Sequence, residues 1–226
     1  MQITFLGHAS LLIEIAETRI VVDPFISANE LAQGKVDLDA LQPDYILLTH
    51  AHQDHILDVE VLAAQKGATI ISNYEIVTHY GNKGLKGHPL NHGGSWDFDF
   101  GRIKYVNAIH TSSFPDGSYG GQPGGFILSA QGKNIYIAGD TALTMDMKLI
   151  PMFLTLDLAI LPIGDNFTMG VDEALIASDF VKCNQILGYH YDTFGYIKIN
   201  HAEAQAAFEG QDKTLHLLDI GASMTI

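Results

Sequence analysis

The chain has 226 residues, of which 47% are apolar, and this is enough for a sizeable hydrophobic core. Its formal charge of −14, from 26 acidic and 12 basic residues, disfavours a nucleic-acid partner because phosphate contacts require basic side chains. The single cysteine, Cys183, excludes an internal disulfide. No apolar run reaches the roughly 18 residues of a membrane span, and residues 1–7 show no signal peptide. We therefore expect a cytoplasmic protein.

The chain begins with short β-like runs. Residues 3–6, 11–15 and 19–22 are apolar runs separated by short turns, and they predict a β-meander. The weakly patterned polar stretch 27–42 is either a loop over a pocket or a surface connection, and we favour the surface connection.

A strand, loop, helix, strand unit follows. Residues 45–49 predict a strand buried on both faces, and it ends directly at His50. Residues 56–66 have helical spacing and stop at Gly67, after which residues 68–72 predict another buried strand.

The second half of the chain alternates between strands and helices. Residues 95–110 predict a hairpin that turns at Gly101, and residues 126–129 and 134–138 predict a second hairpin. Residues 117–125 are rich in glycine and predict an irregular loop. The remaining predicted elements are a strand at 157–161, a helix at 171–183, a strand at 185–188, a helix at 202–208 and short closing strands.

These elements predict one α/β domain that spans residues 1–226. No linker or internal repeat divides the chain. Strands with helices between them, and metal-type residues at strand ends, indicate a layered fold with two sheets inside and helices outside.

Residues 49–55, with the sequence THAHQDH, contain three histidines and one aspartate directly after a buried strand. In an extended or turning loop, alternate side chains face the same way, so His50 and His52 can share one ion while Asp54 and His55 reach a neighbouring one. Imidazole and carboxylate groups suit zinc, iron and related metals. Packing these polar groups beside a strand end without a metal would cost desolvation free energy, which disfavours a chance cluster.

The pattern H-x-H-x-D-H in this segment resembles the signature of the metallo-β-lactamase superfamily. Further positions of that family are matched after later predicted strands by His110 in NAIHTSS, Asp140 in YIAGDTA and His190 in ILGYHYDTF. Within the superfamily, the segments FLGHAS, AGDTALTMDMKLI and LPIGDNFTMG resemble bacterial metal-dependent hydrolases related to ascorbate-6-phosphate lactonase, and this similarity covers nearly the whole chain.

The resemblance implies a four-layer αββα sandwich and two divalent metal ions. Zinc is the preferred metal, and manganese, nickel or iron are the alternatives. It implies that the first ion is held by His50, His52 and His110, the second by Asp54, His55 and His190, with Asp140 bridging the two. A hydroxide bound between the two metals would cleave an ester, lactone, thioester or phosphodiester bond of a small molecule, with Asp54 and Asp140 as catalytic residues.

Four further residues are candidates for supporting the metal loop or contacting the substrate: His8, Asp23, Asn166 and Tyr191. Asp23, in IVVDPF, matches an early aspartate that supports the metal loop in the family, whereas His8 is equally well explained as a hydrogen-bonded turn residue. We favour positions away from the site for His88 and His92, and the role of the 111–125 loop is open.

Two rival functions use the same scaffold. One is an iron-dependent redox enzyme, and the other is a nuclease, which the acidity of the chain disfavours. A metal-binding module without catalysis is a third reading, and the complete ligand set disfavours it. We expect a small-molecule substrate and neither a nucleic-acid nor a membrane partner, while assembly into a homo-oligomer stays open.

Overall fold

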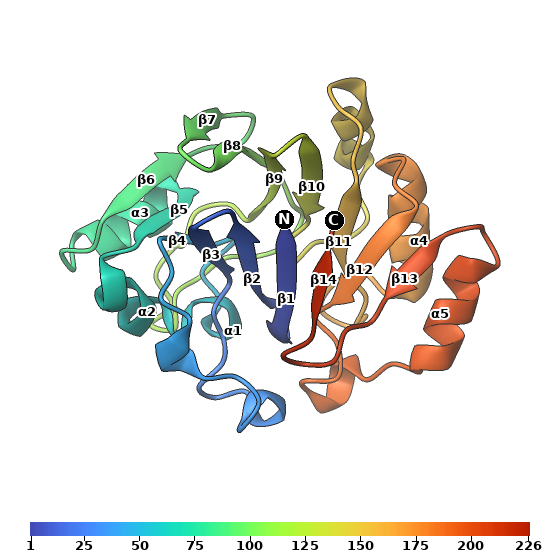
Figure 1. Cartoon of the computed structure of the whole chain (residues 1–226), viewed down its shortest axis with the longest axis horizontal. Coiled ribbons are helices and arrows are strands. Elements are labelled where there is room, and N and C mark those ends of the chain that lie inside the picture. The colour runs from blue at the N-terminus through green and yellow to red at the C-terminus, as the bar shows by residue number, and fades with distance from the viewer.

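The computed structural model describes residues 1–226 and contains two seven-stranded mixed sheets flanked by helices (Figure 1). The first sheet has the order β14-β1-β2-β3-β4-β5-β6, and these strands span Ser223–Thr225, Gln2–Gly7, Ser10–Ile15, Thr18–Val22, Tyr45–Leu47, Thr69–Asn73 and Gly87–Leu90. The second sheet has the order β13-β12-β11-β10-β9-β8-β7, and these strands span Thr214–His216, Gln185–Tyr189, Leu158–Pro162, Lys133–Ile137, Gly124–Ala130, Gly101–Asn107 and Ser95–Phe98.

Five α-helices and four short 3₁₀ helices connect the strands. The α-helices α1 to α5 span Gln53–Ile56, Val59–Lys66, Tyr74–Gly81, Val171–Phe180 and His201–Glu209. The 3₁₀ helices η1 to η4 span Glu30–Ala32, Leu38–Ala40, Met145–Met152 and Gly195–Ile197. None of these helices combines the length and the apolar character that crossing a bilayer demands.

Three apolar clusters hold the layers together. A cluster of 23 buried residues lies between the two sheets, with Ile13 from the first sheet and Phe126 from the second among its members. A second cluster joins the outer face of the second sheet to α4 and α5, and a third joins the outer face of the first sheet to α2 and α3. Figure 1 shows these helix pairs on opposite sides of the molecule. Burial of each large apolar side chain contributes about 1.5–3 kcal/mol, so all three clusters stabilise the sandwich.

Strand direction brings one set of strand ends to the same edge of each sheet. In the first sheet, β1 and β3 both pair antiparallel with β2, and β4 pairs parallel with β3. In the second sheet, β8 and β10 both pair antiparallel with β9, and β11 and β12 continue in parallel. The strands β1, β3 and β4 therefore point one way in their sheet, as do β8, β10 and β12 in theirs.

The four-layer αββα arrangement and both predicted hairpins are confirmed, as is the opening meander. The predicted helix at 56–66 differs, because the chain forms α1 over Gln53–Ile56 and then starts α2 at Val59. The break falls at Asp58, whose carboxylate accepts hydrogen bonds from the backbone N–H groups of Ile26 and Ser27.

Two other differences concern helix ends and missed elements. The helix predicted to reach Cys183 ends at Phe180, because Lys182 adopts a left-handed φ of 54° that a helix cannot continue through. The sequence pattern does not predict α3 or β6. Helix α3 begins where the Asn73 side chain accepts a hydrogen bond from the backbone N–H of Ile76, a contact that caps the helix.

Candidate metal centre

Seven residues with metal-ligating side chains converge where the two sheets meet: His50, His52, Asp54, His55, His110, Asp140 and His190. They follow β4, β8, β10 and β12 or lie in α1. Together with His8, which follows β1, their donor atoms form three overlapping groups, and within each group the atoms lie within 4.8 Å of one another. The structure therefore brings together every residue that the sequence predicts as a metal ligand.

The first group consists of His50, His52 and His110. Nε2 of His50 lies 3.0 Å from Nδ1 of His52. The ring of His110 lies edge-on to both, with centroids 5.1 Å from each. Three imidazole nitrogens are a typical set of protein ligands for a catalytic zinc ion, which keeps its fourth position for water or substrate.

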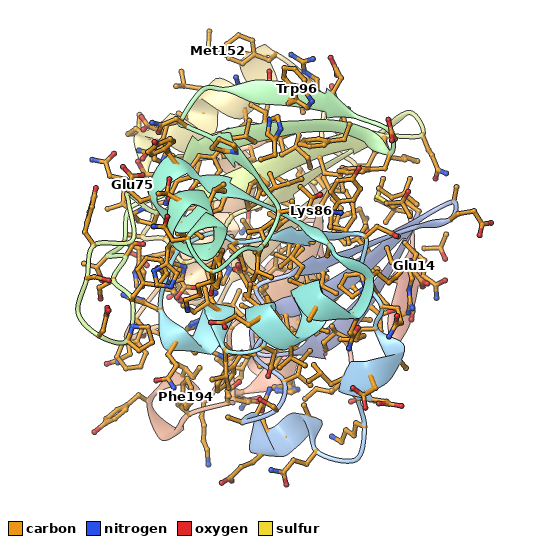
Figure 2. All side chains as sticks on the ribbon, turned by 90° about the vertical axis from the view of Figure 1, so that its left-hand side faces the viewer. Glu14, Glu75, Lys86, Trp96, Met152 and Phe194 are labelled. Atoms are coloured by element: carbon orange, nitrogen blue, oxygen red, sulfur yellow. The ribbon has the colours of Figure 1, made fainter.

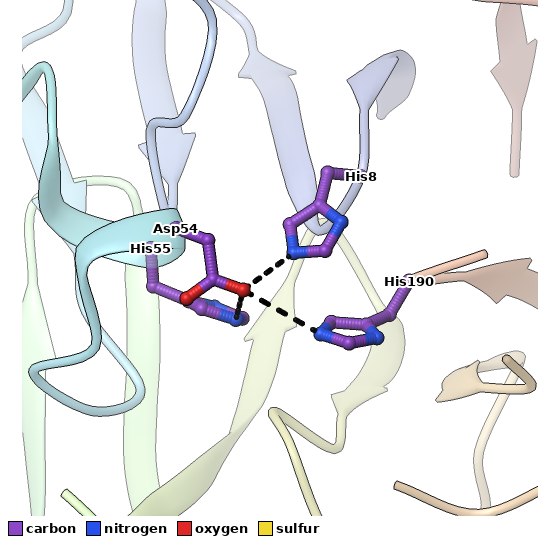
Figure 3. A group of neighbouring side chains, drawn as sticks. All are labelled: His8, Asp54, His55 and His190. Carbon is purple, nitrogen blue, oxygen red and sulfur yellow. Dashed lines mark hydrogen bonds and ion pairs between the residues drawn. The ribbon is translucent and has the colours of Figure 1, made fainter. Parts of the chain in front are cut away.

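The second group is arranged around Asp54 (Figure 3). Its Oδ2 lies 3.0 Å from Nε2 of His8, 3.9 Å from Nε2 of His55 and 4.0 Å from Nε2 of His190. Asp54 and His55 come from α1, whereas His8 and His190 come from the ends of β1 and β12. The sequence pattern predicts that Asp54 and His55 lie in an extended or turning loop, but they lie in a single helical turn.

Asp140 lies between the two groups. Its Oδ2 is 3.0 Å from Nε2 of His190 and 3.4 Å from Nε2 of His55 on one side. On the other side, it is 3.6 Å from Nε2 of His110 and 3.9 Å from Nε2 of His50. One carboxylate oxygen thus faces both groups, the position that a bridging ligand needs.

The backbone turns sharply at three of the strand ends. His8, Asp23 and His190 have left-handed φ values of 55°, 43° and 55°, and each directly follows a strand. Residues other than glycine adopt this conformation rarely, and the strain is typical of functional sites. The N–H of His190 donates a 2.7 Å hydrogen bond to the carbonyl of His8, which links the two sheets at the site.

Asp23 and Thr49 orient His55 and His50 through hydrogen bonds to the Nδ1 atoms of the two rings. Asp23 is fully buried, and its carboxylate accepts from Nδ1 of His55 at 2.9 Å and from Oγ1 of Thr49 at 2.6 Å. The Thr49 hydroxyl, having donated to Asp23, is left to accept from Nδ1 of His50, which lies 3.0 Å away. In the neutral form of each ring, this pattern places the proton on Nδ1 and directs a free Nε2 into the site.

The 111–125 loop supports the same segment. Oγ of Ser112 accepts from the backbone N–H of Ala51 at 3.1 Å and donates to the carbonyl of Gly120 at 3.0 Å. Oγ1 of Thr111 lies 3.3 Å from Nε2 of His52, so it orients this ring with Nδ1 toward the other ligands. The loop therefore holds the ring of His52 and the backbone between the two histidines of the H-x-H pair.

Burial and charge pairing set the protonation of the site. Burial lowers the pKa of His50, His52 and His110, which favours the neutral form that binds metal. Burial also opposes a charge on His55, but the carboxylates of Asp140, Asp54 and Asp23 outweigh it and raise the pKa of that ring.

The two carboxylates in the site are held ionised. Burial disfavours their charge, but the histidines around them outweigh it: His190 and His55 lower the pKa of Asp140, and His55 and His8 lower that of Asp54. Both groups are therefore ready to accept hydrogen bonds or coordinate cations.

The residues present fit a bound metal. Nε2 of His55 and Oδ1 of Asp140 are buried without any hydrogen-bond partner. An unsatisfied buried polar atom costs about 1–3 kcal/mol, and a cation between these groups would remove this cost. The mixture of imidazole and carboxylate donors suits zinc and the neighbouring transition metals.

Several other predicted residues lie outside the site. Asn166 is exposed, and its neighbour Phe167 lines the pocket instead. Tyr191 is buried in the core, with its ring 6.2 Å from that of Phe5. His88 packs against Trp96, and Nε2 of His92 lies 2.9 Å from the carbonyl of Pro123, so neither reaches the metal ligands.

A pocket of about 1080 Å³ lies over the candidate metal ligands. His52, Asp54, His110, Asp140 and His190 form part of its lining. Glu30 and Leu31 also line it, so the polar stretch 27–42 contributes a loop over a pocket, and the preferred reading as a surface connection is wrong. Sequence reasoning also missed the aromatic side chains of Phe25, Phe194 and Tyr196.

Comparison with known proteins identifies the family. The model of the beta-lactamase superfamily domain matches residues 2–190. A UPF0173 metal-dependent hydrolase of Christiangramia forsetii is 64% identical over 226 residues, covering all of both chains, and one of Methylacidiphilum infernorum is 46% identical, again covering all of both chains. The structure of Igni18, a metallo hydrolase of the archaeon Ignicoccus hospitalis, is 30% identical with a TM-score of 0.90, covering 99% of this chain and 97% of Igni18.

These similarities extend over the whole sandwich and agree with the cluster of histidines and carboxylates at its edge. The chain therefore belongs to the beta-lactamase superfamily and, within it, to the UPF0173 metal-dependent hydrolases.

Proposed function

We propose that this hydrolase uses two divalent metal ions, preferably zinc, to cleave an ester, lactone, thioester or phosphodiester bond in a small cytoplasmic molecule. The observation that carries the proposal is the position of Asp140, whose Oδ2 faces His50 and His110 on one side and His55 and His190 on the other. A carboxylate shared by two ligand groups favours a pair of ions over a single one.

In this proposal, His50, His52 and His110 hold one ion and Asp54, His55 and His190 hold the other, with Asp140 shared. When bound, the ions supply an activated water and polarise the substrate oxygen on which negative charge develops. No serine or cysteine nucleophile is needed, which agrees with the burial of Cys183 on the far side of the second sheet in its outer core cluster.

The residues of the chain orient the reacting atoms. The side chain of Asp54 is 28% exposed and lines the pocket, so it can accept a hydrogen bond from the attacking water. Its carboxylate takes the proton as the water oxygen bonds to the carbonyl carbon or phosphorus, and it returns the proton to the departing oxygen or sulfur. His8 holds the Asp54 carboxylate in place through the 3.0 Å contact to Oδ2.

The test combines metal analysis with activity. Protein purified without chelators is expected to carry about two zinc or manganese ions per chain and to hydrolyse at least one member of a panel of lactones, thioesters and phosphodiesters. Asp54→Ala and Asp140→Ala should each reduce turnover at least about 100-fold, whereas Asp116→Ala, an exposed control, should not. A single iron with no hydrolysis, or full metal content and turnover in either alanine variant, contradicts the proposal.

A further inference from the structure

The pocket over the metal centre has an apolar wall made by separate loops. Phe25 and Leu31 come from the segment after β3, Phe167 follows β11, and Phe194 and Tyr196 follow β12. These segments are far apart in sequence, so the wall exists only in the folded chain.

Part of this wall packs directly against His8, beside the candidate metal ligands. The ring of His8, which contacts Asp54, has the ring of Phe25 at 5.5 Å and that of Phe194 at 5.2 Å between centroids. The rings of Phe25 and Phe194 lie 6.2 Å apart. An apolar surface thus begins beside the residues proposed to hold and activate the reacting atoms.

The outer part of the wall is unusually exposed. Phe167 is 49% exposed and Tyr196 is 79% exposed, with their rings 6.3 Å apart. Leu31 is 43% exposed and borders the same pocket. Large apolar side chains gathered around a concave opening mark a ligand site more often than a bare surface.

Away from the candidate metal ligands, the pocket offers no basic side chain to an anionic group. No lysine or arginine lines it, and Glu30 is its one charged side chain besides Asp54 and Asp140, histidines apart. Recognition of a phosphate group normally uses arginine, lysine or a cluster of backbone N–H groups. Lys198 does not line this pocket but a neighbouring depression, and Tyr196 borders both.

We propose that the substrate is an uncharged carboxylic ester, thioester or lactone with an apolar chain or ring that packs against this wall. The inference rests on the hydrolase function proposed above and narrows it, because it excludes substrates with an additional phosphate group and disfavours phosphodiesters. Water adds to the carbonyl carbon, the C–O or C–S bond breaks, and the leaving oxygen or sulfur takes a proton, giving a carboxylic acid and an alcohol or thiol.

The first experiment is a chain-length series on the metal-loaded enzyme. We expect kcat/KM to rise about two- to fourfold per methylene from p-nitrophenyl acetate through the butyrate to the octanoate, until the wall is covered. Bis(p-nitrophenyl) phosphate should be hydrolysed at least about tenfold less efficiently than the octanoate.

The second experiment tests the wall itself. The substitutions Phe167→Ser and Tyr196→Ser, alone and together, should flatten the chain-length dependence, because they lower kcat/KM for the octanoate at least about tenfold more than for the acetate. Met152→Ser is the matched control, since Met152 is 73% exposed and lies at the opposite end of the molecule from Phe194 (Figure 2). It should keep the full chain-length dependence.

A binding measurement separates this inference from the hydrolase proposal. The fluorescence of N-phenyl-1-naphthylamine, an uncharged apolar probe, should increase with wild-type protein, and the Phe167→Ser, Tyr196→Ser double variant should bind it about tenfold more weakly than Met152→Ser does. If no substrate is hydrolysed but this binding pattern holds, the hydrolase proposal fails and the apolar ligand site stands. Three results would overturn the inference. They are hydrolysis without chain-length preference, faster hydrolysis of the phosphodiester than of the octanoate, and probe binding that is unchanged in the Phe167→Ser, Tyr196→Ser double variant.

Discussion

The carboxylate of Asp23 lies 2.9 Å from Nδ1 of His55, 32 positions further along the chain, and both side chains are fully buried. Burial raises the pKa of Asp23, although His55 and Thr49 oppose this shift. The pair orients the imidazole so that Nε2 faces Asp54 and Asp140.

Replacing Asp23 should therefore weaken metal binding more than it alters the fold. We expect Asp23→Asn to lower zinc affinity about 10- to 100-fold, because the amide holds His55 less firmly and removes a negative charge. Competition with a chromophoric chelator measures this affinity. Asp116→Asn, at an exposed loop position, is the control, and equal affinities in the two variants would refute the role of Asp23.

Removing the metal should destabilise the protein. With metal at about 1,000 times its Kd, binding adds about 4 kcal/mol to the free energy of unfolding, and each kcal/mol shifts the Tm of a chain of this size by about 2–4 °C. We expect excess EDTA to lower the Tm by about 10 °C and zinc to restore it, as measured by calorimetry. His50→Ala should respond much less, and an EDTA-insensitive wild type would contradict the prediction.

His8 should affect turnover through Asp54. Its Nε2 lies 3.0 Å from Oδ2 of Asp54 and its Nδ1 lies 3.0 Å from Oγ1 of Thr193. Burial and the neighbouring His190 lower the pKa of His8 to about 4, so the ring is neutral at pH 7 and acts as a hydrogen-bond partner.

We expect His8→Ala to reduce kcat/KM about 10- to 100-fold while two metal ions remain bound. Thr193→Val, which removes the contact with Nδ1 of His8 and a hydrogen bond to the carbonyl of Tyr191 but keeps His8 itself, should have a smaller effect in the same direction. The measurements are steady-state kinetics and metal content, and unchanged kinetics in His8→Ala would show that the contact is structural.

Gly120 leaves no room for a larger residue beside the metal loop. A Cβ atom at this position would lie within van der Waals overlap of the Ala51 side chain and 2.7 Å from Oγ of Ser112. Gly120→Ala should cost about 1–3 kcal/mol in the free energy of unfolding and weaken metal binding by displacing the segment with His50 and His52. Gly81→Ala, where a Cβ meets nothing within 4 Å, should unfold at an unchanged or slightly higher urea concentration. The opposite order of stabilities would contradict this packing argument.

Cys183 should react slowly in the folded protein. It is 3% exposed, and burial raises the pKa of its thiol, so less thiolate forms at any given pH than in a free cysteine. We expect iodoacetamide labelling at pH 8 to be at least about tenfold slower than in urea-unfolded protein, with the rate rising only at higher pH. Mass spectrometry follows the labelling, and equal rates in both states would disprove the prediction.

The candidate metal ligands could be predicted because the sequence resembles the motifs of the family, and the strong apolar patterns of the preceding strands agree with that resemblance. His110, Asp140 and His190 come after β8, β10 and β12, and parallel strands end at the same edge of a sheet. The helical turn that contains Asp54 and His55 could not be predicted, since α1 has only four residues and too few periodic positions to be recognised.

The pocket wall could not be predicted either, because loop geometry decides which side chain faces it. Asp165 and Asn166 both have left-handed φ values, 62° and 54°, and this turn leaves Asn166 exposed to solvent while Phe167 lines the pocket. Tyr191 directly follows His190, yet its side chain packs into the core. Proximity in sequence to a metal ligand therefore does not by itself decide substrate contact, since Thr193 lines the pocket and Tyr191 does not.

Neither sheet alone carries a full set of ligands. His50, His52, Asp54 and His55 follow the first sheet's β4, whereas His110, Asp140 and His190 belong to the second sheet. A folding intermediate with one sheet formed would lack half of the ligands proposed for either ion. Metal affinity should therefore report on whether the two sheets have docked. Substitutions in the core between the sheets, such as at Phe126, should consequently alter metal retention even though they touch no ligand.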